Sequence, residues 1–108
     1  MKASLGELEQ LVMLALLQLG SDAYGAAVQR EIATRTDRGV TLGSVYSTLA
    51  RLEAKGFVRC HVGEPTPVRG GRRRKMYVVE AAGREAMQEA LQALQAMSRG
   101  RWPAAEWT

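Results

Sequence analysis

The sequence has little of what most enzymes, secreted proteins and membrane proteins need. Its 108 residues include one cysteine, one histidine and one phenylalanine, and aromatic residues make up 6% of the chain. A single cysteine excludes a disulfide within the chain and fits a reducing compartment. No apolar run reaches the roughly 18 residues that span a bilayer. Glu7 and Glu9 precede the most apolar stretch, where a secretory signal would carry positive charge. These absences predict a cytoplasmic protein without a membrane partner.

Patterns for catalysis and metal binding are also missing. Cys60 and His61 are neighbours, and neighbours on a strand point to opposite faces, so they cannot form a thiolate–imidazole pair. A zinc site takes three or four protein ligands, which one cysteine and one histidine do not supply. Gly39 and Gly43 lack the spacing and the following lysine of a phosphate-binding loop. The sequence therefore predicts no enzyme, no metal and no cofactor, and it assigns Cys60 and His61 structural roles.

What the chain has in excess is positive charge. The net charge is +4, the pI is near 9.7, and five of the seven residues 69–75 are basic. Charge alone fits nucleic acid or an anionic membrane equally. Because the cations cluster away from any amphipathic helix with large exposed apolar residues, they favour nucleic acid. The length allows one domain with a modest core.

Residues 41–56 predict a helix with a polar, basic face. Thr41 is a suitable N-cap, and Gly56 suits the left-handed residue that follows a helix. On a helical wheel, Val45, Leu49 and Leu52 form the buried stripe. A second face, about a right angle away, carries cations and hydroxyls without a carboxylate: Ser44, Ser47, Thr48, Arg51 and Lys55. This face is either an ordinary solvated surface or one suited to base edges and phosphates.

A β-hairpin with a basic tip is expected next. Residues 57–62 and 75–80 are β-prone, and the connection between them is rich in glycine and proline. The tip ends in the four consecutive cations Arg72, Arg73, Arg74 and Lys75. So much like charge repels itself unless phosphates neutralise it. Helix, hairpin and tip together favour a winged helix-turn-helix over a loop without function.

The remaining helices suggest a dimer. Residues 5–19 predict a first helix whose middle is hydrophobic on every side, which favours cover by a second chain over enclosure by its own domain. Residues 23–35 predict a second helix, capped by Asp22, that braces the third one. Residues 82–99 predict a last helix with a narrow apolar stripe typical of a coiled-coil seam. The predicted dimer interface comprises Leu8, Val12, Leu16, Met87, Leu91, Leu94 and Met97.

Three short stretches recur in the order and spacing of a known family. They are Tyr24-Gly25; Gly43-Ser44-Val45-Tyr46 with Leu49, Arg51-Leu52-Glu53 and Gly56; and Gly71-Arg72-Arg73-Arg74-Lys75 with Tyr77 and Gly83. In these residues the chain resembles the PadR family of bacterial winged-helix transcriptional regulators, in its short form with a single C-terminal helix. The resemblance covers about residues 8–97. Ser47 departs from a frequent proline, Met76 from an aromatic residue and Glu80 from a capping threonine, which leaves the start of the last helix open by a residue or two.

The resemblance implies a mainly α (α+β) fold, with three helices, a two- or three-stranded β wing and a C-terminal dimerisation helix. The winged helix-turn-helix domain would span residues 1–80, the dimerisation helix 81–99 and a tail 100–108, which is either disordered or folds back through Trp102. A homodimeric repressor is implied, often one induced by a small aromatic or drug-like effector. Its recognition helix would enter the major groove and its wing would follow the minor groove or backbone. Tyr46 is either a phosphate contact or a core residue.

The leading hypothesis is a sequence-specific repressor that binds double-stranded DNA at an inverted-repeat operator. The predicted DNA contacts are Ser44, Tyr46, Ser47, Thr48, Arg51 and Lys55 in the helix, and Gly71, Arg72, Arg73, Arg74 and Lys75 in the wing. The alternative is a winged-helix module that binds a protein partner without sequence-specific DNA binding. A third hypothesis makes the dimer interface chiefly a receptor for hydrophobic drugs.

Overall fold

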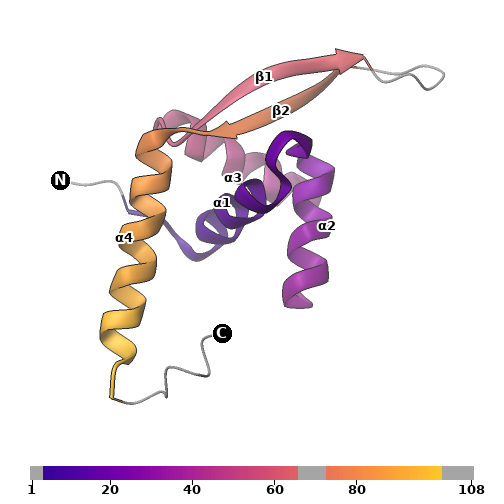
Figure 1. The fold of residues 1–108 in the computed structure, drawn as a ribbon. Helices are drawn as coiled ribbons and strands as arrows, with labels where there is room; N and C mark the ends of the chain where they lie inside the picture. The colour runs from indigo at the N-terminus through magenta and orange to yellow at the C-terminus, as the bar shows by residue number, and fades with distance from the viewer. Residues whose placement is uncertain (1–3, 66–72, 101–108) are drawn as a thin grey trace.

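The computed structural model describes residues 4–65 and 73–100. In these residues the order of elements is α1 (Glu7–Leu19), a 3-10 turn (Gly20–Asp22), α2 (Gly25–Thr36), α3 (Leu42–Ala54), β1 (Val58–Pro65), β2 (Arg73–Val79) and α4 (Ala81–Ser98). The first three helices form the body, the antiparallel hairpin lies across one side of it, and α4 runs away from the hairpin's base (Figure 1). The prediction of a mainly helical winged helix-turn-helix is confirmed.

The hydrophobic core is built around α1. This helix contacts α2, α3, β2 and α4, and each of the other α-helices and both strands contribute at least one buried side chain to the same cluster. Val12 and Leu16 are 0% and 3% exposed, so they are core residues of a single chain. Their prediction as dimer contacts is wrong, because the domain itself encloses this side of α1. Leu8 is only partly buried against the core.

Local signals define both ends of α3, as the sequence predicts. Thr41 Oγ1 accepts a hydrogen bond of 3.0 Å from the backbone N–H of Ser44, which satisfies a donor in the first turn. At the other end Gly56 has φ +78°, and the N–H of Phe57 reaches back to the carbonyl of Leu52. This is the hydrogen-bond pattern that closes a helix through a left-handed glycine.

The start of α2 differs from the prediction, which placed an Asp22 cap before Ala23. The helix begins at Gly25, and its N-cap residue is Tyr24, whose side chain makes no capping hydrogen bond. The carbonyl of Ala23 accepts a hydrogen bond from the N–H of Tyr77, and Tyr24 forms a β-bridge with Met76. The hairpin therefore holds this backbone extended until Tyr24. Within the described residues the sheet has two strands, and this isolated bridge adds one further pairing beside β2.

The hairpin pairs β1 and β2 with Cys60 opposite Tyr77 and His61 opposite Met76. Cys60 is half-buried against the core whereas His61 is exposed, so the two side chains alternate as predicted. Burial and the neighbouring Cys60 raise the pKa of Tyr77 to about 12. The sheet's inner face thus continues the core beneath the wing.

Close packing fixes α4 to the hairpin. Its N-cap residue is Glu80, but this carboxylate accepts a hydrogen bond from Arg59 Nε instead of capping the helix. At Gly83, an added Cβ would lie 2.3 Å from the carbonyl oxygen of Phe57 and 2.8 Å from Met13 Cε. Only glycine allows this approach, because real Cβ atoms do not come so near to a backbone oxygen.

Gly83→Ala should therefore lower the free energy of unfolding by about 2 kcal/mol, within the range for overpacking a core. The better helix propensity of alanine, about 1 kcal/mol, does not offset a clash with a backbone atom. Urea unfolding followed by circular dichroism measures the loss. The matched control is Gly39→Ala, because nothing lies within 4 Å of a Cβ there. Equal stability of the two variants would contradict the close contact of α4 with Phe57 and Met13.

Candidate nucleic-acid interface

The outward face of α3 carries only small side chains. Residues Val45, Leu49 and Leu52 are fully buried, and the opposite side of the wheel holds Gly43, Ser47, Ala50 and Ala54, all exposed. Nothing lies within 4 Å of a Cβ built at Gly43. A helix with such a face brings its backbone close to whatever surface it docks against. Ser47 is the one residue of this row that the sequence assigned to DNA binding.

The polar face predicted from the sequence lies along one edge of this row. Two of its residues, Thr48 and Lys55, have surroundings that differ from the prediction. Thr48 is 0% exposed, so its prediction as a surface contact is wrong. Its hydroxyl donates to the carbonyl of Ser44 at 2.7 Å and accepts from Arg51 Nη2 at 3.0 Å, which satisfies the buried group. Thr48 therefore positions Arg51, whereas Ser44 and Arg51 themselves are exposed.

Lys55 is the second residue whose surroundings differ from the prediction, because it forms an ion pair within the protein. Its Nζ lies 2.7 Å and 2.9 Å from the two carboxylate oxygens of Glu9, and 2.9 Å from the carbonyl of Ser4. The Lys55 side chain is 29% exposed and that of Glu9 9%. The face is therefore not free of carboxylates, because α1 supplies one from 46 residues away in the sequence. Lys55 joins α3 to α1, and its charge is already compensated before DNA is present.

Glu9 carries the matching half of this ion pair. Burial acts to raise its pKa, but hydrogen bonds from Lys55 and the N–H of Gly6, with the charges of Lys55 and Arg51, outweigh burial and hold the pKa below its ordinary value. Glu9 Oε1 accepts the N–H of Gly6 at 2.8 Å, so the same carboxylate also caps α1. Sequence reasoning missed Glu9.

Tyr46 lies on the other edge of α3 and combines two roles. Its ring packs so closely on Gly25 that an added Cβ at that position would lie 2.5 Å from a ring carbon. Tyr46 nevertheless remains 42% exposed. Gly25 and Tyr46 thus form one packing contact that sets how α2 meets α3.

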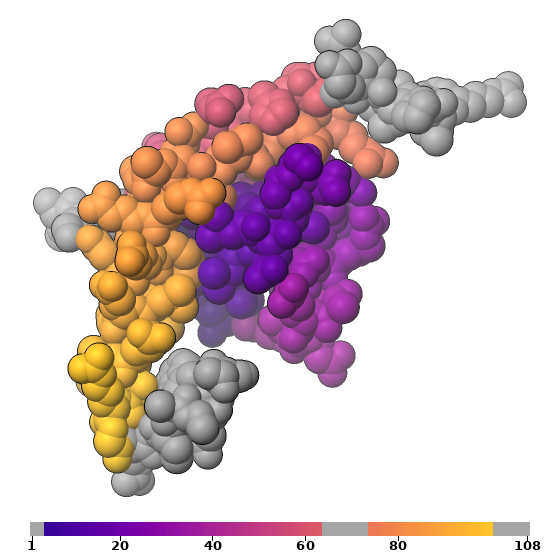
Figure 2. Space-filling model, viewed as in Figure 1, coloured from indigo at the N-terminus to yellow at the C-terminus, as the bar shows by residue number. Residues whose placement is uncertain are grey.

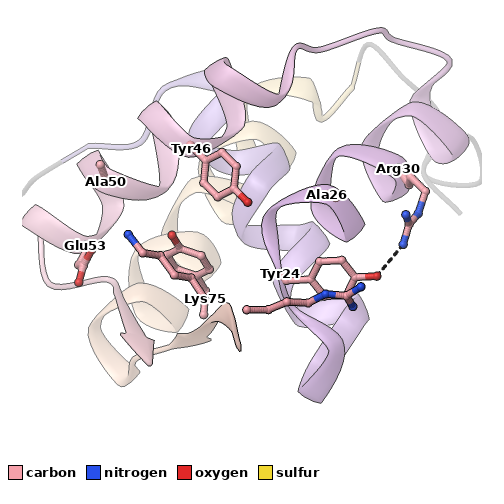
Figure 3. Close-up of a pocket in the computed structure, with 9 residues that line it drawn as sticks. Tyr24, Ala26, Arg30, Tyr46, Ala50, Glu53 and Lys75 are labelled. Atoms are coloured by element: carbon pink, nitrogen blue, oxygen red, sulfur yellow. Dashed lines mark hydrogen bonds between the residues drawn. The ribbon is translucent and has the colours of Figure 1, made fainter. Parts of the chain in front are cut away.

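A groove of about 710 Å³ separates this edge of α3 from α2 and β2 (Figure 3). Arg74 and Lys75 enter it from β2, Arg30 from α2, and the carboxylate of Glu53 lies at the α3 end. At the other end Arg30 Nη2 donates to the hydroxyl of Tyr24 at 2.9 Å, and the Arg74 guanidinium lies 4.2 Å from the centre of the Tyr24 ring. The hairpin and α3 therefore border one shared surface.

The electrostatics of this groove are positive at its Tyr24 end. The hydrogen bond from Arg30 lowers the pKa of the Tyr24 phenol; burial opposes this, and the charges of Arg30 and Arg74 add to the lowering. Of the wing residues predicted to bind DNA, Arg74 and Lys75 are exposed on β2. Arg73 begins that strand, while Gly71 and Arg72 lie outside the described residues.

The family comparison decides what class of protein carries this surface. The sequence profile described as "Transcriptional regulator PadR-like family" matches residues 13–89. The chain belongs to the PadR-like family of transcriptional regulators. The resemblance in the sequence is thereby confirmed. The family is described as one of transcriptional regulators.

Solved structures agree on the fold of this PadR-like regulator. A PadR family transcription regulator from hypervirulent Clostridium difficile superposes with a TM-score of 0.74 at 21% identity, covering 87% of this chain and 93% of that one. A PadR family transcriptional regulator from Eggerthella lenta gives 0.68 at 26% identity, over 87% and 81%. A winged-helix DNA-binding protein from STIV gives 0.66 at 18% identity, over 86% and 92%. No protein of curated function matches by sequence.

The last helix of the PadR-like regulator divides into a packed half and an exposed half. Met87 is 2% exposed and belongs to the core, so its prediction as a dimer contact is wrong. Leu91, Leu94 and Met97 are exposed, Met97 to 84%. Figure 2 shows this half of α4 projecting from the body of the molecule. None of the helices within residues 4–65 and 73–100 is long and apolar enough to cross a membrane.

Proposed function

We propose that this PadR-like regulator is a homodimeric repressor that binds an inverted-repeat DNA operator and is released by a small aromatic molecule. The observation that carries DNA binding is the outer face of α3. Its row of small residues is bordered by Arg51 on one side and by the cations of β2 on the other. Such a face suits a helix that enters the major groove while its edges meet phosphates.

In this proposal, Arg51 and the small residues beside it contact the edges of the bases. Arg51 is exposed, and its guanidinium is held by the buried Thr48 hydroxyl. Arginine reads guanine through two hydrogen bonds, serine bonds to any base edge, and alanine fits the thymine methyl group. Ser47 and Ala50 offer the last two chemistries on the same face. The cations of β2 and of the wing tip then supply attraction that does not depend on sequence.

Dimerisation is assigned to the exposed half of α4. Leu91, Leu94 and Met97 form an apolar surface that a single chain leaves to solvent, and a second copy is its simplest cover. Symmetric recognition helices would lie about 34 Å apart, one turn of the duplex, which requires an inverted repeat. The predicted contacts Val12, Leu16 and Met87 drop out of this interface, while Leu8 stays in it.

The effector is assigned to the groove between α1 and α4. This groove has a volume of about 420 Å³ and is lined by apolar side chains that include Leu5, Ala90 and Leu94, a size and character typical of small-molecule sites. A planar aromatic molecule bound there would change how the protomers meet, and with it the distance between recognition helices. Adding a panel of such molecules to the operator complex should release DNA, with a change in tryptophan fluorescence.

Salt titration tests the proposal against the protein-interaction alternative. Duplexes are first selected from a random-sequence library, and their affinity is then measured at about 50 and 200 mM salt, where six to ten phosphate contacts change affinity by about 10³- to 10⁵-fold. A steep salt dependence with a recovered inverted repeat supports the repressor. No enrichment and no salt dependence would favour a module that binds protein.

Arg51→Ala should cost about 2 kcal/mol of binding to the selected operator, roughly 30-fold in affinity, and relax the preference at one base pair of each half-site. Arg99→Ala is the control, since it removes the same charge from the far end of α4. Repeating the selection with each variant measures the effect. An unchanged base preference in Arg51→Ala would show that Arg51 contacts phosphate only.

A further inference from the structure

The strongest feature without an assigned role is the Tyr24 end of the groove between α2, α3 and β2. Two guanidinium groups from different elements converge there on one tyrosine. Arg30 Nη2 donates to the phenol oxygen at 2.9 Å, and Arg74 stacks on the ring at 4.2 Å from its centre. None of the ion pairs between described residues involves Arg30 or Arg74. Each guanidinium has five N–H donors, so most of them face the groove or solvent.

A second observation at the same place also points to an anion. The N-cap residue of α2 is Tyr24, whose side chain makes no capping hydrogen bond, and the first turn of the helix carries no acidic residue. The positive end of the helix dipole lies at this end of α2, and Ala26 of the first turn lines the same groove. Among the described residues that line the groove, the one carboxylate is that of Glu53, which stands at the opposite end (Figure 3). The charges therefore favour one anion at the Tyr24 end and oppose one near Glu53.

We propose that this end of the groove is a clamp for one phosphate of the DNA backbone, held by Arg30 and Arg74, with Tyr24 as the residue that positions both. The inference rests on the proposed DNA binding and adds to it a fixed register contact. Arginine suits a phosphate because its planar fork forms two parallel hydrogen bonds. The groove is open and borders both the outer edge of α3 and β2, so a continuous duplex backbone can reach it.

The clamp changes the role of Arg74. From the sequence it is one of four consecutive wing cations that attract DNA without regard to position. In the structure its guanidinium is stacked on a ring that belongs to α2, so it is held at a defined place between the wing and the body. A phosphate bound to both arginines would tie β2 to α2, and it would fix where along the backbone each half-site sits.

Neutral phosphate substitution tests the clamp. Methylphosphonates are placed one at a time along a duplex chosen by selection, and the affinity of the full-length protein is measured for wild type, Arg30→Gln and the control Arg99→Gln. One position in each half-site should weaken wild type and Arg99→Gln about 10-fold or more. The same position should have no further effect on Arg30→Gln. The slope of log affinity against log salt should fall by about 0.9 for each lost contact.

Two further variants separate positioning from folding. Tyr24→Phe keeps the ring beneath Arg74 and should lose part of the effect at that one phosphate, whereas Tyr24→Leu should lose nearly all of it. Arg30 is exposed, so Arg30→Gln should unfold at the wild-type temperature. If every methylphosphonate weakens wild type and Arg30→Gln by the same factor, the clamp is overturned and DNA binding stands. If wild type binds no duplex, the clamp and the proposed function fall together.

Discussion

Replacing Lys55 by methionine is expected to lower the free energy of unfolding by about 3 kcal/mol at neutral pH. The substitution leaves Glu9, whose side chain is 9% exposed, without the ammonium group that lies 2.7 Å from it. Removing one partner of a buried ion pair typically costs about 3–5 kcal/mol. The lower end applies because the Lys55 side chain keeps 29% of its surface in solvent. Urea unfolding at pH 7 measures the loss.

The loss should depend on pH. The pKa of Glu9 is lowered in the native protein, so its carboxylate stabilises the fold above the ordinary value of 4.5, and this contribution disappears as the pH falls through the lowered pKa. Without Lys55, burial meets less opposition and the pKa of Glu9 rises. Once Glu9 is protonated in both proteins, the pair no longer distinguishes them. The difference in stability should therefore shrink as the pH falls from 7 through 4.5 and below the lowered pKa.

A double variant separates the ion pair from DNA contact. Glu9→Gln combined with Lys55→Met removes both charges, so it should recover most of the stability lost in Lys55→Met alone. Operator affinity, measured where all variants are folded, should change little in either. Suppose instead that Lys55→Met is as stable as wild type but binds DNA more weakly. Lys55 would then be the DNA contact that the sequence predicted.

Local chemistry explains which parts of the fold could be predicted. Thr41 and Gly56 act on the turns next to them, and for that reason the bounds of α3 follow from sequence alone. Asp22 also has the character of a cap, but the hydrogen bond between Ala23 and Tyr77 joins residues that are far apart in the chain and keeps the backbone extended. A distant strand thus overrides a local signal. No local rule anticipates such a contact.

The same distinction separates the predicted from the missed site residues. A wheel places Ser44, Thr48 and Arg51 on one side of α3, but it does not say that a threonine at the edge of the buried stripe is covered and bonded to the backbone. The sequence does not predict the contact between Arg30 and Tyr24, because Tyr24 precedes α2 and its place does not follow from the helical wheel of that helix. The last helix carries an apolar stripe, but a wheel does not show where along the helix that stripe leaves the body: Met87 is buried in the core, whereas Leu94 and Met97 are exposed.

Introducing two carboxylates on the exposed half of α4, as Leu94→Glu with Met97→Glu, is expected to separate the proposed dimer and to reduce affinity for the proposed operator by about 10²- to 10⁴-fold. Leu94 and Met97 are 50% and 84% exposed in the single chain, so their loss should leave the fold of each protomer intact. Across a two-fold axis each new carboxylate meets its like charge on an apolar surface. A monomer then binds each half-site alone and loses the gain in effective concentration that linkage provides.

The control places the same charges elsewhere on the helix, as Gln88→Glu with Gln92→Glu, where exposed residues point away from the apolar stripe. Sedimentation equilibrium should show monomer for the first variant and dimer for the control. Against a duplex that carries a single half-site, both variants and wild type should bind with similar affinity, since no second contact exists to lose. If the Leu94 and Met97 variant stays dimeric and keeps its preference for the inverted repeat, the protomers meet through another surface, and the spacing of the recognition helices must be set there.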